Sequence, residues 1–285
     1  MKTIIVPMDF SNEALPGLNL SLMLADKTGA NIQMVHVVKK NDNSDNEHLK
    51  MEHQLAEMNF KKVLQKYNEK ANLKYTIKEG KIFREINDLA NTFDDALIVL
   101  STHGESGFEE LFIGGNAYKI ISHSKNPVIT VRKCTISSNI DKIVMLLDIT
   151  FQTREKVPYT VKLAKIFNSE IHLLSVRLTH IKSIEKKLQQ YVEQVALYIG
   201  NQNIPYTVEH LQGDNLTDIT LDYANSVNAD LISIMTEQEK SVSNLLLGSY
   251  AHQMINKACI PVLSFPNYQL RIIADDVWDL GAFNA

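Results

Sequence analysis

The hydrophobic positions of this chain fall into short apolar runs, separated by longer segments with helical patterns. The runs are rich in β-branched residues, and four of the five in the first half are apolar enough along their length to suggest strands buried on both faces of a sheet. They cover residues 3–9, 31–38, 73–80, 96–102 and 127–133, and then 141–148, 170–176, 204–211, 230–235 and 260–265. Each half of the chain therefore predicts five strands with four helices between them.

The helices of the first half have identifiable ends. The first is expected to begin at an N-cap, Ser11, to hold Pro16 near its first turn and to close at Gly29. A fourth helix is expected to end before Pro127, which cannot continue it. The ranges expected to be helical are 11–28, 44–71, 82–93 and 114–124.

The two halves also resemble each other in sequence. The aligned segments are 9–38 with 148–177, and 111–131 with 245–265. Asp9 then falls on Asp148, and Gly114 falls on Gly248. A repeat of roughly 135 residues is too long for a solenoid unit and fits two complete domains fused in tandem.

Strands that alternate with helices indicate an open, mostly parallel sheet covered on both faces. The expected fold class is α/β, with two tandem, doubly wound, five-stranded, Rossmann-like sheets. We expect domains at residues 1–133 and 140–266 and a C-terminal extension at 267–285. In such sheets ligands bind beyond the carboxyl ends of the strands, which is where functional residues are expected.

Composition narrows the class of protein. The 285 residues are 45% hydrophobic, so each half can bury an ordinary core. A net charge of -4 argues against nucleic acid or an anionic membrane as the main partner. The two cysteines belong to no metal-ligand cluster and favour a reduced compartment. Because no segment has the apolar length of a signal peptide or a membrane span, a cytoplasmic location is expected.

Polar residues and glycines follow two strands of the first half. Asp9 follows the first strand, residues 101–104 end the fourth, and Gly114 and Gly115 open the next helix. An aspartate here can accept a hydrogen bond from an adenine amino group or a ribose hydroxyl, and a glycine loop entering a helix presents N–H groups to phosphate. The alternative is structural: Asp9 caps a turn, and the glycines permit tight turns. Spacing alone leaves both interpretations open.

Four segments resemble the universal stress protein family in its tandem two-domain form: 7–11, 34–38, 101–132 and 244–265. ATP-binding members carry G-x2-G-x9-G-[ST] after the fourth strand, together with the strand-one aspartate. The resemblance implies a fold like that of the adenine nucleotide alpha-hydrolases and a site for ATP or another adenine nucleotide, which Mg²⁺ could accompany. It implies adenine or ribose contacts from Pro7, Asp9 and Val37, and phosphate or ribose contacts from Leu100, Ser101, His103, Gly104, Gly114, Gly115 and Asn116.

The first half departs from this pattern at two positions. Ser101 stands in place of the first glycine, and Gly115 stands in place of the serine or threonine that binds phosphate. Losing one such hydrogen bond costs about 0.5–1.5 kcal/mol, at most roughly a factor of ten in affinity. We therefore expect nucleotide binding to be weakened rather than lost, with Asn116 as a replacement donor.

The second half departs more strongly. Met235 and Gln238 replace the first two glycines of the pattern, Leu146 replaces Pro7, and Glu237 occupies the position of His103. A carboxylate at Glu237 would face the phosphates, and like charges in a poorly hydrated site repel. The second site is therefore expected to be degenerate.

Three functions remain open from the sequence. The first is a cytoplasmic stress-response regulator that binds an adenine nucleotide in its first domain. The second is a nucleotide-free interaction protein, because the resemblance implies that domains pair through their last strands, either within one chain or in a homodimer. The third is a very slow ATPase. Since no Walker lysine follows the glycine loop and no carboxylate pair is obviously placed to hold Mg²⁺, no catalytic residue is expected.

Several other residues have structural interpretations. His36 and His172 lie inside apolar strands and are expected to be hydrogen-bonded rather than catalytic. Cys259 lies on an apolar stretch and is expected to behave as a small hydrophobe. The apolar extension at 267–285 is expected to dock on the body of the protein or on a second molecule.

Overall fold

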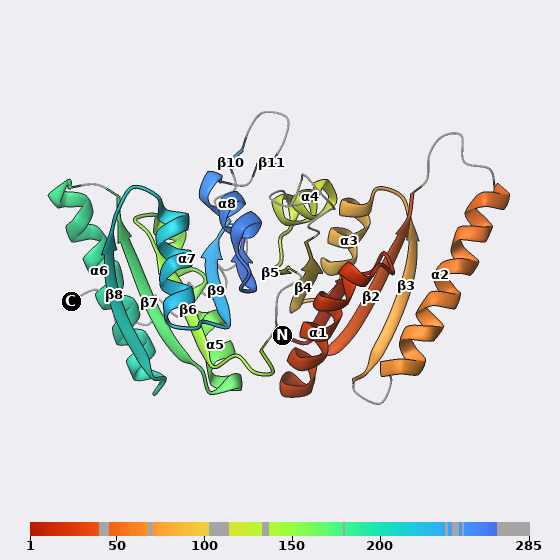
Figure 1. Ribbon diagram of the computed structural model, residues 1–285, viewed down its shortest axis with the longest axis horizontal. Coiled ribbons are helices and arrows are strands. Elements are labelled where there is room, and N and C mark those ends of the chain that lie inside the picture. Colours follow the sequence, from red (N-terminus) through yellow and green to blue (C-terminus); the bar gives the residue numbers. More distant parts are fainter. Residues whose placement is uncertain are drawn as a thin grey trace. The chain divides into compact units, whose positions relative to one another are not determined.

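The computed structural model describes residues 1–39, 46–67, 71–102, 114–132, 137–178, 180–236, 239–240, 245–246 and 248–266. The chain divides into two compact units, Met1–Cys134 and Thr135–Ala285, and each is described by itself. Each unit contains a parallel five-stranded sheet whose strands alternate with helices (Figure 1). The predicted fold class, two tandem doubly wound α/β domains, is confirmed.

Unit 1 has the strand order β3-β2-β1-β4-β5. Its elements are β1 (Thr3–Pro7), η1 (Asn12–Ala14), α1 (Leu15–Thr28), β2 (Asn31–Val38), α2 (Asn46–Tyr67), β3 (Leu73–Glu79), α3 (Ile82–Ala90), β4 (Ala96–Ser101), α4 (Gly115–His123) and β5 (Val128–Val131). The strand order reverses at β1, which pairs with β2 on one side and β4 on the other. This reversal places the expected ligand site beyond the carboxyl ends of β1 and β4.

Unit 2 repeats this topology in the order β12-β9-β6-β7-β8. Its elements are β6 (Lys142–Leu147), η2 (Phe151–Arg154), α5 (Val157–Phe167), β7 (Glu170–Arg177), α6 (Lys182–Asn201), β8 (Tyr206–Gln212), α7 (Leu216–Ser226), β9 (Leu231–Met235), β10 (Glu239–Lys240), β11 (Leu245–Leu246), α8 (Ser249–Lys257) and β12 (Val262–Phe265). The antiparallel hairpin β10–β11 was not predicted, because two-residue strands are too short to produce a hydrophobic period.

The first helix of each unit shows that the sequence repeat is also a structural one. Gly29 ends α1 in the left-handed conformation with φ 68°, and Asn168 ends α5 in the same way with φ 56°. The Ser21 hydroxyl donates to the Gly17 carbonyl at 2.7 Å, and the corresponding Thr160 hydroxyl donates to the Lys156 carbonyl at 2.9 Å. Gly17 in unit 1 and Lys156 in unit 2 are therefore equivalent positions.

Two expectations at the margins of the fold have different outcomes. Cys259 is exposed, in the turn between α8 and β12, so its expected role as a small buried hydrophobe is wrong. It follows Ala258, the C-cap of α8, whose backbone is extended and ends the helix before the strand begins. The extension at 267–285 lies outside the described residues, and its docking stays a prediction. None of the helices in the described ranges combines the length and hydropathy that a membrane span requires.

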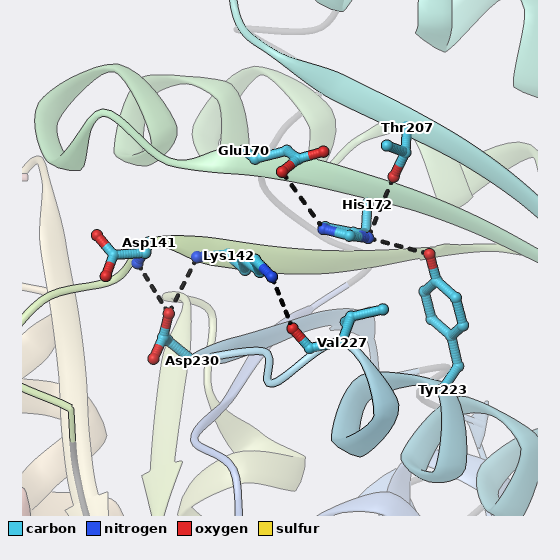
Figure 2. A network of polar contacts seen from close by, with 8 residues as sticks. All are labelled: Asp141, Lys142, Glu170, His172, Thr207, Tyr223, Val227 and Asp230. Atoms are coloured by element: carbon cyan, nitrogen blue, oxygen red, sulfur yellow. Dashed lines mark hydrogen bonds and ion pairs between the residues drawn. The ribbon is translucent and has the colours of Figure 1, made fainter.

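A polar network joins β6, β7, β8 and α7 at the amino ends of the unit 2 strands (Figure 2). The Asp230 carboxylate accepts from the backbone N–H groups of Asp141 and Lys142, at 2.8 and 3.0 Å. Nδ1 of His172 lies 3.0 Å from the Tyr223 hydroxyl and 3.1 Å from the Thr207 hydroxyl. As expected, His172 is a buried, hydrogen-bonded strand residue.

The network makes unit 2 sensitive to acid. Burial lowers the pKa of His172 from its ordinary value of 6.5, against the opposing effect of Glu170, whose carboxylate lies 3.8 Å from Nε2. The unfolded chain therefore binds this proton more tightly than the folded chain. The contribution to stability is fully present above the ordinary pKa and is lost as the pH falls from there through the lower pKa of the folded state.

A His172→Gln variant is expected to show a smaller loss of unfolding free energy between neutral and mildly acidic pH than the wild type. The equivalent residue of unit 1 is Gln33, whose amide donates to the Thr76 hydroxyl at 2.8 Å, so a glutamine at this strand position can hydrogen-bond to a threonine of the neighbouring strand. Urea denaturation across this pH range measures the difference. A residual slope is expected from His252, because burial also lowers its pKa. Equal slopes in wild type and variant would contradict the prediction.

Candidate functional site

A cavity of about 640 Å³ opens at the carboxyl ends of β1, β2 and β4 in unit 1. Eight of the ten site residues expected from the sequence line it: Pro7, Asp9, Val37, Leu100, Ser101, Gly114, Gly115 and Asn116. The other two, His103 and Gly104, lie outside the described residues. The structure thus brings together residues from four separate elements and their adjoining turns, and their role in binding stays a prediction.

The cavity wall also contains residues that the sequence did not single out for the site. Ile82 and Ile86 line it from one face of α3, His36 and Lys39 from the end of β2, and Glu52 from α2. Ile82 and Ile86 are four residues apart and therefore share a helix face, which was an available signal. That Glu52 lines the cavity could not be predicted from the sequence, because it depends on how α2 packs beside β3.

Asp9 has a structural role in the turn that follows β1. Its Oδ1 accepts hydrogen bonds from the backbone N–H of Ser11 at 3.0 Å and from the Ser11 hydroxyl at 2.6 Å. Ser11 in turn caps η1, accepting from the N–H of Ala14 at 3.3 Å. The structural interpretation of Asp9 is therefore correct, and the same turn holds its carboxylate on the cavity wall. The two roles are compatible.

Aromatic packing fixes the chain immediately after Asp9. Phe10 has φ 64°, a left-handed conformation that costs a bulky residue on the order of 1–3 kcal/mol. Its ring packs 4.8 Å from the ring of His36 and 4.8 Å from that of Phe60, which stacks on Tyr75 at 4.6 Å. His36 Nδ1 lies 2.7 Å from the Met8 carbonyl oxygen, so this histidine is hydrogen-bonded as expected. Packing from α2 and β3 therefore supports the turn that positions Asp9.

Ser101 uses its hydroxyl to join β4 to the start of α1. The hydroxyl accepts from the Gly17 N–H at 2.9 Å and donates to the Ala14 carbonyl at 3.3 Å. A Cβ at Gly17 would lie 3.0 Å from Ser101 Oγ and 3.2 Å from its backbone nitrogen, so this close approach favours glycine. The departure from the family glycine at 101 is therefore accommodated by the absence of a side chain at Gly17.

The glycines at the start of α4 are not required by the backbone. Gly114 has φ -56° and ψ 140°, and Gly115 is the first residue of the helix. A Cβ on either would meet no atom of the described residues within 4 Å. The described backbone therefore gives no support to the interpretation that Gly114 and Gly115 serve only a tight turn. Without side chains, they leave the N-terminal N–H groups of α4 accessible from the cavity they line.

No metal centre accompanies this site within the parts of the chain that the structure describes. There, no three His, Cys, Asp or Glu side chains gather closely enough to hold an ion. Two histidines of α2 contact carboxylates instead: His53 Nε2 lies 2.9 Å from Glu79, and His48 Nε2 lies 3.5 Å from Glu52.

In unit 2 a lysine fills the space beside β6. Lys156, at the Gly17 position, is 1% exposed. Its ammonium donates to the carbonyl of Thr153 at 2.6 Å and to the Thr153 hydroxyl at 3.1 Å. That hydroxyl accepts from the backbone N–H of Asp148 at 3.0 Å, so the lysine lies at the carboxyl end of β6.

A tyrosine side chain also contacts the carboxyl end of β9 in unit 2. Tyr250 occupies the Asn116 position, and its hydroxyl donates to the carbonyl of Met235 at 2.7 Å. The Gly248 N–H at the start of α8 donates to the Thr236 carbonyl at 3.1 Å and is therefore already engaged. Glu237 and Gln238, on which the sequence argument for a degenerate site relied, lie outside the described residues.

Comparison with known proteins gives one consistent result. The model of the universal stress protein family matches residues 1–132 and 139–266. A universal stress protein from Methanocaldococcus jannaschii is 27% identical over 142 residues, which cover 46% of this chain and 82% of that protein. The crystal structure of a universal stress protein from Archaeoglobus fulgidus superposes with a TM-score of 0.76 at 20% identity, covering 94% of this chain and 97% of that one. A functionally unknown protein from Pseudomonas aeruginosa superposes with a TM-score of 0.68 at 13% identity, covering 98% and 97% of the two chains.

Proposed function

Because the chain belongs to the universal stress protein family, we propose that its first unit binds an adenine nucleotide (ATP, ADP or AMP) in the cavity at the carboxyl ends of β1 and β4. The observation that carries this proposal is the meeting of eight expected contact residues on the wall of one cavity. The volume of 640 Å³ falls within the range of about 300–1,000 Å³ that small-molecule sites occupy.

The two ends of the cavity suit the two ends of a nucleotide. Pro7, Asp9 and Val37 would hold the adenine or ribose, with the Asp9 carboxylate as hydrogen-bond acceptor. Gly114 and Gly115 would receive the phosphates at the N-terminus of α4, where N–H groups and the helix dipole favour negative charge. Asn116 adds an amide donor beside them. Leu100 and Ser101 would complete the wall, together with His103 and Gly104, which follow β4 in the sequence.

The second unit is proposed to bind no nucleotide. The supporting observations are the buried Lys156 at the Gly17 position and Tyr250 at the Asn116 position, which occupy the ends of β6 and β9. One nucleotide per chain then follows. The protein would act as a cytoplasmic, nucleotide-responsive stress regulator rather than as an enzyme. Any Mg²⁺ would arrive with the phosphates, and pairing of domains through β5 and β12 stays a prediction.

The proposal is tested by denaturing freshly purified protein and separating the released nucleotide by ion-exchange chromatography. Near-stoichiometric adenine nucleotide is expected from the wild type. The Asp9→Ala variant should release no nucleotide, because removing a charge-assisted hydrogen bond lowers the affinity about tenfold or more. Asp148→Ala is the matched control, because Asp148 accepts from Thr150 in the same kind of turn but lies in unit 2.

Two results would refute the assignment to unit 1. One is retention of nucleotide by Asp9→Ala together with its loss from Asp148→Ala. The other is an absence of bound nucleotide combined with no rise in melting temperature at millimolar ATP. The second result would favour the nucleotide-free interaction protein.

A further inference from the structure

Helix α2 has apolar residues on two opposite faces. Its inner face buries Leu49, Ala56, Phe60 and Tyr67. Its outer face carries Met51, Leu55 and Met58, which are 68%, 51% and 47% exposed. Successive helical residues turn by about 100°, so the outer three share one stripe directly opposite the buried four. Figure 1 shows α2, in orange, beyond β3 at the edge of the unit 1 sheet.

Charged residues extend this stripe at both ends. Glu47 lies one turn before Met51, Lys62 lies one turn after Met58, and both are exposed. The α2 stripe therefore consists of Glu47, Met51, Leu55, Met58 and Lys62. Single exposed apolar side chains are ordinary, but three in a row on one helix form a continuous patch.

The stripe is complementary to itself when reversed. Its positions are arranged almost symmetrically about Leu55, so two antiparallel copies place Glu47 opposite Lys62 and Met51 opposite Met58. The rest of the helix broadly follows the same polarity: Glu47 and Glu52 lie in its first half, and Lys61, Lys62 and Lys66 lie in its second, with Lys50 and Glu57 as the exceptions. Such self-complementarity is the requirement of a two-fold interface.

We propose that α2 is a homodimer interface, in which a second copy of this chain docks its own α2 antiparallel across the stripe. The two-fold axis passes close to Leu55, which packs against Leu55 of the partner subunit. Two equivalent ion pairs join Glu47 to Lys62 of the partner subunit and the reverse. Methionine side chains suit this contact because they adapt to a partner surface.

The proposed interface is small, so the dimer should be weak and should form only at high protein concentrations. One helix pair buries less than the roughly 1,200–2,000 Å² of a standard stable interface. The dissociation constant is therefore expected to be on the order of 10–1,000 µM, as for weak assemblies. Sedimentation equilibrium of the full chain across this concentration range should show a reversible monomer–dimer equilibrium.

Leu55→Glu places two carboxylates at the two-fold axis and is expected to raise the dissociation constant at least about tenfold. Leu197→Glu is the matched control, because Leu197 is 55% exposed on α6 of unit 2 and should leave the equilibrium unchanged. A protein that stays monomeric at the highest concentration, or a dimer unaffected by Leu55→Glu, would overturn the proposal. The latter result is expected if dimers form through β5 or β12 instead.

Charge reversal tests the antiparallel register. Glu47→Lys and Lys62→Glu should each weaken the dimer severalfold, whereas the double variant restores both ion pairs and should recover wild-type association. Far-UV circular dichroism of the variants separates these effects from a loss of helix. Failure of the double variant to recover, with its helix content intact, would overturn this register.

Discussion

Replacing Phe60 by alanine is expected to lower the free energy of unfolding of unit 1 by about 3–5 kcal/mol, the range for a buried phenylalanine. The ring is fully buried and contacts the rings of Phe10 and Tyr75. Its loss removes apolar contacts and leaves a cavity between α2 and the sheet. It also removes a support of the left-handed Phe10, so nucleotide affinity should fall together with stability.

Urea denaturation followed by far-UV circular dichroism measures this change, and hydrogen exchange locates it in residues 1–134. Lys61→Ala is the control on the same helix, because this exposed residue should change stability by no more than about 0.5 kcal/mol. A loss below about 1 kcal/mol in Phe60→Ala would mean that α2 contributes little to the unit 1 core.

Asn116→Tyr is expected to abolish nucleotide binding, with a loss of at least about 100-fold in affinity. The substitution introduces the residue that unit 2 carries at this position, where Tyr250 donates to the carbonyl of Met235. In unit 1 the phenol would reach toward the equivalent carbonyl of Ser101 and occupy the space beside Gly114 and Gly115. Isothermal titration calorimetry with ATP measures the effect.

Asn116→Ala separates filling of the cavity from loss of the amide. It removes one donor and should weaken binding by at most about tenfold. The melting temperature of each variant without nucleotide shows whether the fold is intact. Equal affinities for the tyrosine and alanine variants, both folded, would contradict the filling mechanism and would also weaken the proposal that unit 2 binds no nucleotide.

The sequence predicted the strands well because each is an apolar run between turn residues. It placed β4 at residues 96–102, and the strand is Ala96–Ser101. Helix ends were less exact: the range 44–71 contains α2 at Asn46–Tyr67. Register was beyond sequence reasoning. Val35 pairs with Thr76 in unit 1, and the corresponding pair in unit 2 is Leu174 with Glu209. A single sequence does not show which residues of two strands pair, because pairing depends on packing between distant segments.

The candidate site was predictable where topology alone decides it. Asp9 and Ser101 end neighbouring parallel strands, so their positions on one cavity wall follow from the strand order. Gly17 was not singled out, because its importance depends on a contact with Ser101, which is 84 residues away in sequence. The role of Phe60 was hidden for the same reason, since a single sequence does not show which side chains meet across elements.

The paired turns of the two units bear on how such duplicated chains diverge. Asp148 accepts from the backbone N–H of Thr150 at 2.7 Å, just as Asp9 accepts from Ser11, although Lys156 and Tyr250 fill the neighbouring space. An aspartate after the first strand would thus persist in a domain that no longer binds a ligand, because its side chain still stabilises the turn. In comparisons among relatives, that aspartate alone is a poor marker of an active copy. Under the proposed function, the residues at the positions of Gly17 and Asn116 are the better markers, because they differ between the unit proposed to bind nucleotide and the unit proposed not to.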